Sequence, residues 1–211
     1  MVSLNELIED SKENFASDPE ERLIVSGVNW ESYENLLAKL EDNSHYRITY
    51  LDEILEIVSP SQKHETVKSR IGFLLEFYFY KKKIKHKPMG STTVKNRLKK
   101  VGAEPDECYC IGEPKDIPDL AIEVTITSGS IKKLETYLRL GVKEVWFWKN
   151  GGFSLYYLRE EVPSRFVETY GYEQVQGSVL IPSLNISFLT ECVLIPDQID
   201  ACEKFEEGIA R

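Results

Sequence analysis

Apolar residues recur along this chain with two different spacings, and each spacing predicts a different kind of element. Between positions 46 and 58 they follow the two-residue repeat of a strand, interrupted by Asp52-Glu53, which predicts a β-hairpin with an acidic turn. Over positions 62–80 they recur every three or four residues, which predicts a long helix. Asn29 and Ser61 stand before a short helix and this long one, and both are favoured N-cap residues.

The long helix is expected to carry apolar residues on two sides. His64 lies on the same stripe as Val67 and Ile71, whereas Phe73 and Phe77 fall on the opposite side. Such a helix is either buried on both faces or contacts a second copy of the chain. We therefore expect a homodimer.

Strands dominate the second half of the sequence. The mostly apolar run at 119–126 is typical of a central strand. Ser128-Gly129-Ser130 then precedes a helix expected at 131–140, which Gly141 ends. Other segments expected to be extended are 89–95, 103–111, 144–148, 153–158 and, as an edge element, 179–189. This order predicts a mixed α/β fold of the α+β kind, with a central mixed sheet flanked by helices and the hairpin at its N-terminal side.

The composition is that of an ordinary globular protein. Of 211 residues, 42% are hydrophobic and 29% charged, which excludes a disordered chain. We expect an N-terminal leader at 1–28, a single domain at 29–190 and an acidic helical tail at 191–211. No run approaches the roughly 20 apolar residues of a membrane helix, and the N-terminus lacks the features of a secretory signal. The four cysteines are therefore expected to be reduced thiols in a cytoplasmic protein without a membrane partner.

Charge is distributed unevenly. The chain has a net charge of −9, yet the segment 81–100 holds eight Lys and one Arg and no acidic residue. A concentrated basic segment on an acidic body can grip a phosphate backbone locally, and Lys95, Arg97 and Lys99 are the candidate contacts to nucleic acid. The alternative is a solvated surface on which lysine stems cover apolar groups.

Glu123 is the most informative polar residue, because its neighbours in the predicted central strand are apolar. A carboxylate in that position requires a partner, which can be a metal ion, a lysine or backbone donors. Asp106 stands at the start of the preceding strand, so both carboxylates can reach one point if the two strands are neighbours. Two carboxylates held close repel each other unless a cation lies between them, and oxygen ligands suit Mg²⁺ or Mn²⁺ better than Zn²⁺.

Lys133 follows on the next predicted helix, with Tyr137 one turn further on. An ammonium there could position a water molecule or neutralise charge that develops on a phosphoryl group. Each residue also has a structural interpretation. Asp106 could be a turn residue, Glu123 could pair with a structural cation, and Lys133 could be solvated. Taken together, in strand, strand, helix order, the three favour a site.

These motifs resemble a known family. The similarity covers about residues 46–189 and is most specific where Glu104-Pro105-Asp106 is followed by Pro118-Asp119-Leu120-Ala121-Ile122-Glu123-Val124, then Ser128, Lys133-Leu134, Tyr137, Gly141-Val142 and Glu144-Val145-Trp146. This pattern is similar to that of the Uma-two family of putative restriction endonucleases, in the PD-(D/E)xK nuclease superfamily. The resemblance implies a restriction-endonuclease-like core in which acids on two adjacent strands hold Mg²⁺ and a lysine assists the attacking water.

By position, Asp106 matches the first acid of the superfamily motif and Glu123 the second. The superfamily pattern places lysine two residues after the second acid, where this chain has Thr125, and the resemblance points to Lys133 as the replacement. His64 matches a histidine near the start of the family's first helix and is either a catalytic residue or a core histidine. Glu65 is a further candidate metal ligand, although its helical angle directs it away from the apolar stripe.

Three functions follow as hypotheses. The first is a metal-dependent endonuclease that hydrolyses phosphodiester bonds in DNA, with Mg²⁺ as cofactor and Mn²⁺ as substitute. The second is a catalytically inactive binding or assembly module that keeps the nuclease fold, which the threonine at position 125 and the acidic net charge favour. The third is a metal-dependent hydrolase of a small phosphate ester.

Overall fold

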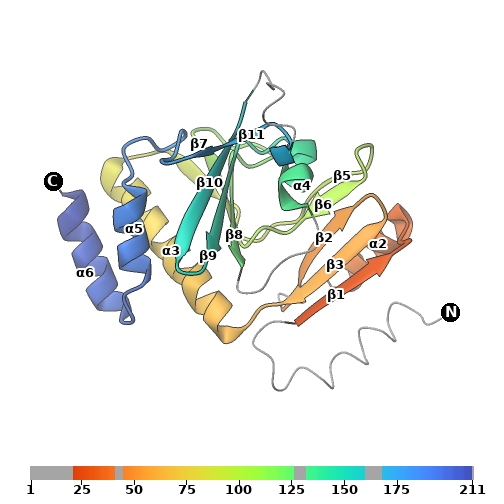
Figure 1. Ribbon diagram of the computed structural model, residues 1–211, viewed down its shortest axis with the longest axis horizontal. Helices are drawn as coiled ribbons and strands as arrows, with labels where there is room; N and C mark the ends of the chain where they lie inside the picture. The colour runs from red at the N-terminus through yellow and green to blue at the C-terminus, as the bar shows by residue number, and fades with distance from the viewer. Residues whose placement is uncertain (1–20, 41–44, 126–131, 160–167, 211) are drawn as a thin grey trace.

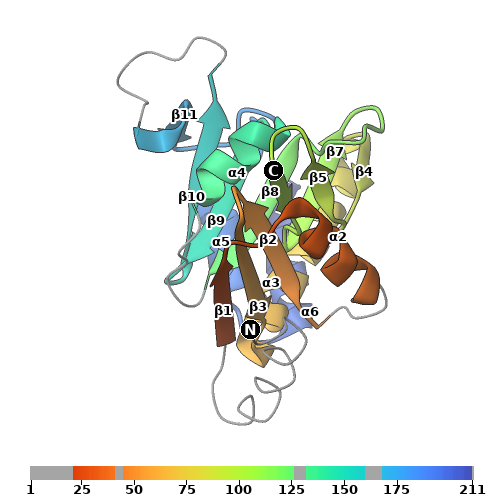
Figure 2. The same cartoon turned by 90° about the vertical axis from the view of Figure 1, so that its right-hand side faces the viewer.

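The computed structural model describes residues 21–40, 45–125, 132–159 and 168–210. Their strands form two sheets that lie side by side (Figures 1 and 2). The larger sheet has six strands in the order β11 (Tyr172–Val175), β10 (Gly152–Leu158), β9 (Glu144–Lys149), β8 (Leu120–Thr125), β7 (Glu107–Ile111) and β4 (His86–Pro88). Only the pair formed by β8 and β9 is parallel, so this sheet is mixed.

The smaller sheet is antiparallel throughout and has five strands. Their order is β1 (Glu21–Ser26), β3 (Ile54–Ser59), β2 (Arg47–Leu51), β6 (Val101–Ala103) and β5 (Val94–Asn96). Asp52 and Glu53 form the turn between β2 and β3, both with positive φ. The expected hairpin with an acidic turn is therefore present, and it forms part of a larger sheet.

Helices cover the two faces of the six-stranded sheet differently. One face packs on α3 (Gln62–Lys82), α5 (Ile186–Val193) and α6 (Gln198–Ile209), with Trp146 and Trp148 buried in the core between them. The other face packs on α4 (Lys133–Leu140), which also contacts β5 and β6 of the smaller sheet (Figure 1). The last of the described helices, α2 (Trp30–Lys39), covers the five-stranded sheet.

This layering explains the apolar run of β8. Leu120, Ile122 and Val124 belong to the core beneath α3, whereas Ala121 belongs to the core beneath α4. Since alternate residues of a strand face opposite sides, both sides of β8 are buried, as is usual for a central strand. Glu123 has the parity of Ala121 and therefore lies on the α4 side of the sheet.

The helix ends follow the expected local rules. Asn29 accepts a hydrogen bond from the amide of Ser32, and Ser61 accepts one from the amide of His64, so both act as N-caps. Gly141 ends α4 in the left-handed conformation, with φ 90°. The proposed cap at Ser128-Gly129-Ser130 lies outside the described residues.

The mixed α/β architecture is confirmed, and several local expectations need correction. The end of the segment expected to be a leader forms β1, which pairs with β3; residues 1–20 lie outside the described part of the chain. The segment 89–95 is extended only at its end, because β4 ends at Pro88 and β5 begins at Val94. The segment 179–189 is no edge strand, since it turns into α5. The expected tail does contain helix, α6.

Candidate active site

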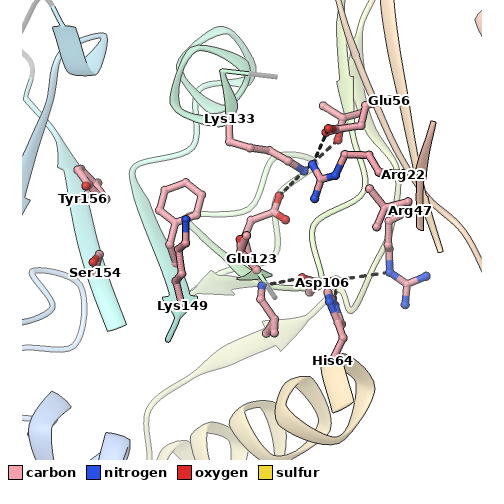
Figure 3. Close-up of a pocket in the computed structure, with 15 residues that line it drawn as sticks. Arg22, Arg47, Glu56, His64, Asp106, Glu123, Lys133, Lys149, Ser154 and Tyr156 are labelled. Carbon is pink, nitrogen blue, oxygen red and sulfur yellow. Dashed lines mark hydrogen bonds and ion pairs between the residues drawn. The ribbon is translucent and has the colours of Figure 1, made fainter. Parts of the chain in front are cut away.

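The pairing of β7 with β8 brings the two predicted acids to one place. Glu107 is opposite Ile122 in this antiparallel pair, so Asp106, just before β7, lies across from Glu123. Both residues border a pocket of about 330 Å³ that opens between the two sheets (Figure 3). Asp106 and Glu123 therefore face the same side of the sheet, as the sequence argument required.

Asp106 is held from three directions. One carboxylate oxygen, Oδ2, accepts a hydrogen bond from the amide of Val124 at 2.7 Å, which ties β7 to β8. The other oxygen, Oδ1, lies 2.9 Å from Nε2 of His64 and 3.7 Å from Nε of Arg47. With 2% of its surface exposed, Asp106 is a buried carboxylate whose position is fixed by neighbouring donors.

His64 reaches this carboxylate because of where α3 begins. Ser61 caps the helix, which places His64 in the first turn with its ring directed toward the sheet. Its hydrogen bond to Asp106 shows that the core-facing stripe leads into the pocket. The sequence left two interpretations open, and the structure joins them: His64 is buried, and it also lines the pocket.

Glu123 is engaged through one oxygen. Tyr137 donates a short hydrogen bond to Oε1, and the ammonium of Lys133 lies 2.9 Å from the same atom. Within the part of the chain that the structure describes, both of these contacts use Oε1, which leaves Oε2 available to a cation. Tyr137 and Lys133 stand one turn apart on α4, so this helix presents both donors to the buried acid.

The pKa shifts of Glu123 and Lys133 indicate that the site favours positive charge. Burial raises the pKa of Glu123, the charge of Asp106 raises it further, and Lys133 opposes both effects. Burial lowers the pKa of Lys133, but the carboxylates of Glu123, Glu56 and Asp106 together leave it above its usual value. A divalent cation would meet the same electrostatic demand that keeps Lys133 protonated.

Lys133 therefore reaches the acid although the superfamily position is occupied by Thr125. Its ammonium also lies 3.0 Å from the hydroxyl of Thr49 on β2, so it stands at the junction of the two sheets. Thr125 borders the pocket as well. The structure places Lys133 beside Glu123; its role as the replacement for the superfamily lysine stays a prediction.

Several cationic residues of the pocket were not found from the sequence. Arg22 on β1, Arg47 on β2 and Lys149 on β9 all border it. Arg22 makes an ion pair with Glu56 at 2.6 Å, and Figure 3 shows both beside Lys133. No sequence motif identifies these residues, because they come from strands that are distant in the chain and meet only across the gap between the sheets.

The predicted phosphate contacts lie elsewhere. Lys95, Arg97 and Lys99 belong to β5 and to the turn between β5 and β6, and they do not line the pocket. Lys95 pairs with Glu34 of α2 at 3.1 Å. Their contact with a long nucleic acid, at some distance from the acids, stays a prediction. They do not contribute to the pocket itself.

Glu65 points away from the acids, as its helical angle indicated. Its side chain is 42% exposed and pairs with Arg47 at 3.3 Å and with Lys68 at 3.4 Å. It does not line the pocket. Glu65 thus contacts the site through Arg47, the residue that also faces Asp106.

The donor set suits Mg²⁺, which prefers carboxylate oxygens, retains several waters and is often bound by one or two carboxylates together with substrate phosphates. Asp106 and Glu123 supply two such carboxylates, and Oε2 of Glu123 is the oxygen left for a cation. No group of three or more His, Cys, Asp or Glu is arranged to hold a metal ion anywhere in the described ranges. A metal here would thus depend on these two acids, water and substrate.

A mixed sheet flanked by helices, with acids from two adjacent strands beside a lysine, defines a restriction-endonuclease-like fold. The chain belongs to the Uma2 (Uma-two) family, described as putative restriction endonuclease, whose pattern matches residues 30–189. This is the family that the sequence motifs resembled, and it lies in the PD-(D/E)xK-like superfamily. Family membership indicates a nuclease.

No curated protein matches the chain. Among the described helices, none is both long enough and apolar enough to cross a membrane.

Proposed function

We propose that this protein is a metal-dependent endonuclease that hydrolyses phosphodiester bonds in DNA. The observation that carries the proposal is the convergence of Asp106, Glu123 and Lys133 on one polar pocket from β7, β8 and α4. Burying two carboxylates that repel each other lowers the stability of the folded protein, and such groups are frequent at functional sites. Membership of a nuclease family agrees with a catalytic role for them.

Each residue has a task in the proposed reaction. Asp106 and Glu123 would hold Mg²⁺, which when bound would neutralise charge on the phosphoryl group and lower the pKa of a bound water. Lys133 would orient the attacking water and stabilise the negative charge that grows on the phosphoryl oxygens. Tyr137 keeps the carboxylate of Glu123 in place by donating to Oε1.

His64 acts through Asp106 in this proposal. Its hydrogen bond fixes the orientation of the Asp106 carboxylate, while Arg47 adds a positive charge on the same side. The family description supports DNA as the substrate, and the basic segment 81–100 supports an additional contact to its backbone.

A nicking assay tests the proposal with matched variants. Supercoiled plasmid is incubated with the protein and Mg²⁺ or Mn²⁺. We expect nicking by the wild type, loss of at least about 100-fold in rate for Lys133→Ala, and no loss for Lys132→Ala, because Lys132 is the exposed neighbour outside the pocket. Plasmid and single-stranded DNA that both stay intact with the wild type, or equal nicking by Glu123→Gln, would contradict it.

A second function has its own supporting observation. Both acids already have partners in the protein. Asp106 lies beside the ring of His64 and the guanidinium of Arg47, and Glu123 pairs with Lys133. Such pairing is also what an inactive binding or assembly module with the nuclease fold would retain. Calorimetric titration with Mn²⁺ separates the two functions, since the inactive module predicts no carboxylate-dependent binding of the metal.

We also propose that the protein is a homodimer. The second apolar side of α3 is indeed turned outward. Phe73 is 46% exposed and Tyr80 65% exposed, while Phe77 stacks on Phe73 with ring centroids 6.4 Å apart. Large aromatic groups on a surface are typical of contacts between proteins, and an enzyme that cuts two strands benefits from two sites.

A further inference from the structure

One side of the pocket is not used by the reaction proposed above. Phe147 on β9 and Tyr156 on β10 both border the pocket, with ring centroids 5.7 Å apart and planes at 78°. The strand register aligns Glu123 with Phe147 and Phe147 with Ser154, so these side chains share one face of the sheet. A pair of partly buried aromatic rings thus stands beside the acids.

The opposite side of the pocket is cationic. Arg22 and Arg47 come from the five-stranded sheet, and Figure 3 shows Glu123 and Lys133 lying between them and the side chain of Tyr156. Arg22, Arg47, Lys133 and Lys149 provide four positive charges, against the carboxylates of Glu56, Asp106 and Glu123. A bound divalent cation would increase this positive balance, so the pocket suits an anionic ligand.

The depth of the acids limits what can reach them. Asp106 is 2% exposed and Glu123 7%, and the pocket they border measures about 330 Å³. This volume is at the lower end of the range for small-ligand sites, about 300–1,000 Å³. A base-paired duplex keeps its bases stacked inside and would meet only the rim, whereas a single nucleotide could enter between the sheets.

We propose that the pocket takes an unpaired nucleotide of a DNA strand, either from a single-stranded segment or turned out of a duplex. Its base would stack on the ring of Tyr156 and meet Phe147 edge-on, because the two rings stand nearly perpendicular. Its phosphate would lie toward Lys133, Arg22 and Arg47. This inference rests on the proposed function and adds the class of substrate. Because every base presents an aromatic face, stacking of this kind provides binding with little dependence on sequence.

Binding without turnover gives the first test. Fluorescence anisotropy in EDTA compares a labelled single-stranded oligonucleotide with the fully paired duplex of the same sequence. We expect the single strand to bind at least about tenfold more tightly. Tyr156→Ala should weaken single-strand binding about 5- to 100-fold, because one base–aromatic stack is lost, whereas Tyr156→Phe should retain it.

The matched control is Tyr157→Ala. Tyr157 is the next residue of β10, is partly buried like Tyr156, and lies outside the pocket, where Arg159 packs over its ring. Removing the ring of Tyr157 should leave the affinity for the single-stranded oligonucleotide unchanged. Phe147→Leu, which keeps apolar volume but removes the ring, repeats the test if Tyr156→Ala does not fold. Duplex binding as tight as single-strand binding, or equal effects of Tyr156→Ala and Tyr157→Ala, would overturn the inference.

A cleavage experiment with Mg²⁺ distinguishes the two proposals. If the duplex is cut faster than the single strand, the inference about the substrate is wrong while hydrolysis stands. If neither is cut, but binding selects the single strand and depends on Tyr156, hydrolysis is wrong while the inference about the occupant stands. Preferential cutting of the single strand supports both.

Discussion

The ammonium of Lys133 lies 2.9 Å from Oε1 of Glu123 although the two residues belong to different elements, α4 and β8. The same ammonium reaches Thr49 of the other sheet at 3.0 Å. One side chain therefore links the acid in the larger sheet to the smaller sheet, at the point where the pocket opens. This contact brings the ammonium of a helix residue to the acid, whereas Thr125, two residues after the acid, carries no charge.

The pairing of Glu123 with Lys133 has an interaction energy that a double-mutant cycle can measure. Lys133→Met should lower the free energy of unfolding by about 3–5 kcal/mol, because it leaves a buried carboxylate without its cation. Adding Glu123→Gln should recover most of this loss. Urea denaturation at pH 7 gives the four values. Additive effects of the two substitutions would show that the contact is energetically unimportant.

Metal binding should depend on Asp106 as well as on Glu123. Calorimetric titration with Mn²⁺ should show a site in the wild type and a loss of affinity of at least about tenfold in Asp106→Asn, since one of two carboxylate ligands is removed. Asp116→Asn is the control, because Asp116 is exposed and lies outside the pocket. Equal affinities of the wild type and Asp106→Asn would remove Asp106 from the metal site.

Glu107 makes stability depend on pH. Burial raises the pKa of this carboxyl to about 7, with smaller effects from Lys68 and Glu76. Because this pKa is higher in the folded state than in the unfolded state, Glu107 contributes its full stabilisation below about pH 4.5. That contribution is lost as the pH rises through about 7. Glu107→Gln should therefore stabilise the protein at pH 8, by about 1–3 kcal/mol, and have little effect at pH 4. Thermal unfolding at both pH values checks this.

The exposed Glu113 provides the control for that experiment, since Glu113→Gln should change stability little at either pH. A stabilisation by Glu107→Gln that is equal at pH 4 and pH 8 would mean that the titration of Glu107 is not its cause.

Arg70 should anchor the C-terminal helices. Its guanidinium is buried and donates to the carbonyls of Val193 and Pro196 and to the side chain of Gln198. Arg70→Met should cost about 2–4 kcal/mol of stability, because several carbonyl groups lose a charged donor. Limited proteolysis should then cut first between α5 and α6. An unchanged cleavage pattern would mean that other contacts hold this segment.

The outward aromatic groups of α3 should hold two copies together. If they do, light scattering at micromolar concentration should give the mass of a dimer, and Phe73→Ser should shift it toward the monomer, since Phe73 is nearly half exposed in a single copy. Thr66→Ser, on the exposed part of the same helix, should leave the mass unchanged. A monomeric wild type contradicts the homodimer.

The sequence by itself determined the hairpin, the capped helices and the order of the acids along the chain. The apolar repeats and the caps at Asn29 and Ser61 act over one or two turns, so α2 and α3 could be placed without knowing any distant contact. The apolar run of β8 showed that Glu123 is buried, and its nearness in sequence to Asp106 made adjacent strands the simplest arrangement.

Only the tertiary structure decided what surrounds these acids. The pairing of β1 with β3 and the approach of two separate sheets bring Arg22 and Arg47 to the same pocket as Tyr156, which lies more than a hundred residues further along the chain. The tertiary structure also separates Lys95 from the acids, although the charge of Lys95 had suggested a role in binding nucleic acid. Such contacts depend on packing between sheets, which no short-range pattern in the chain records.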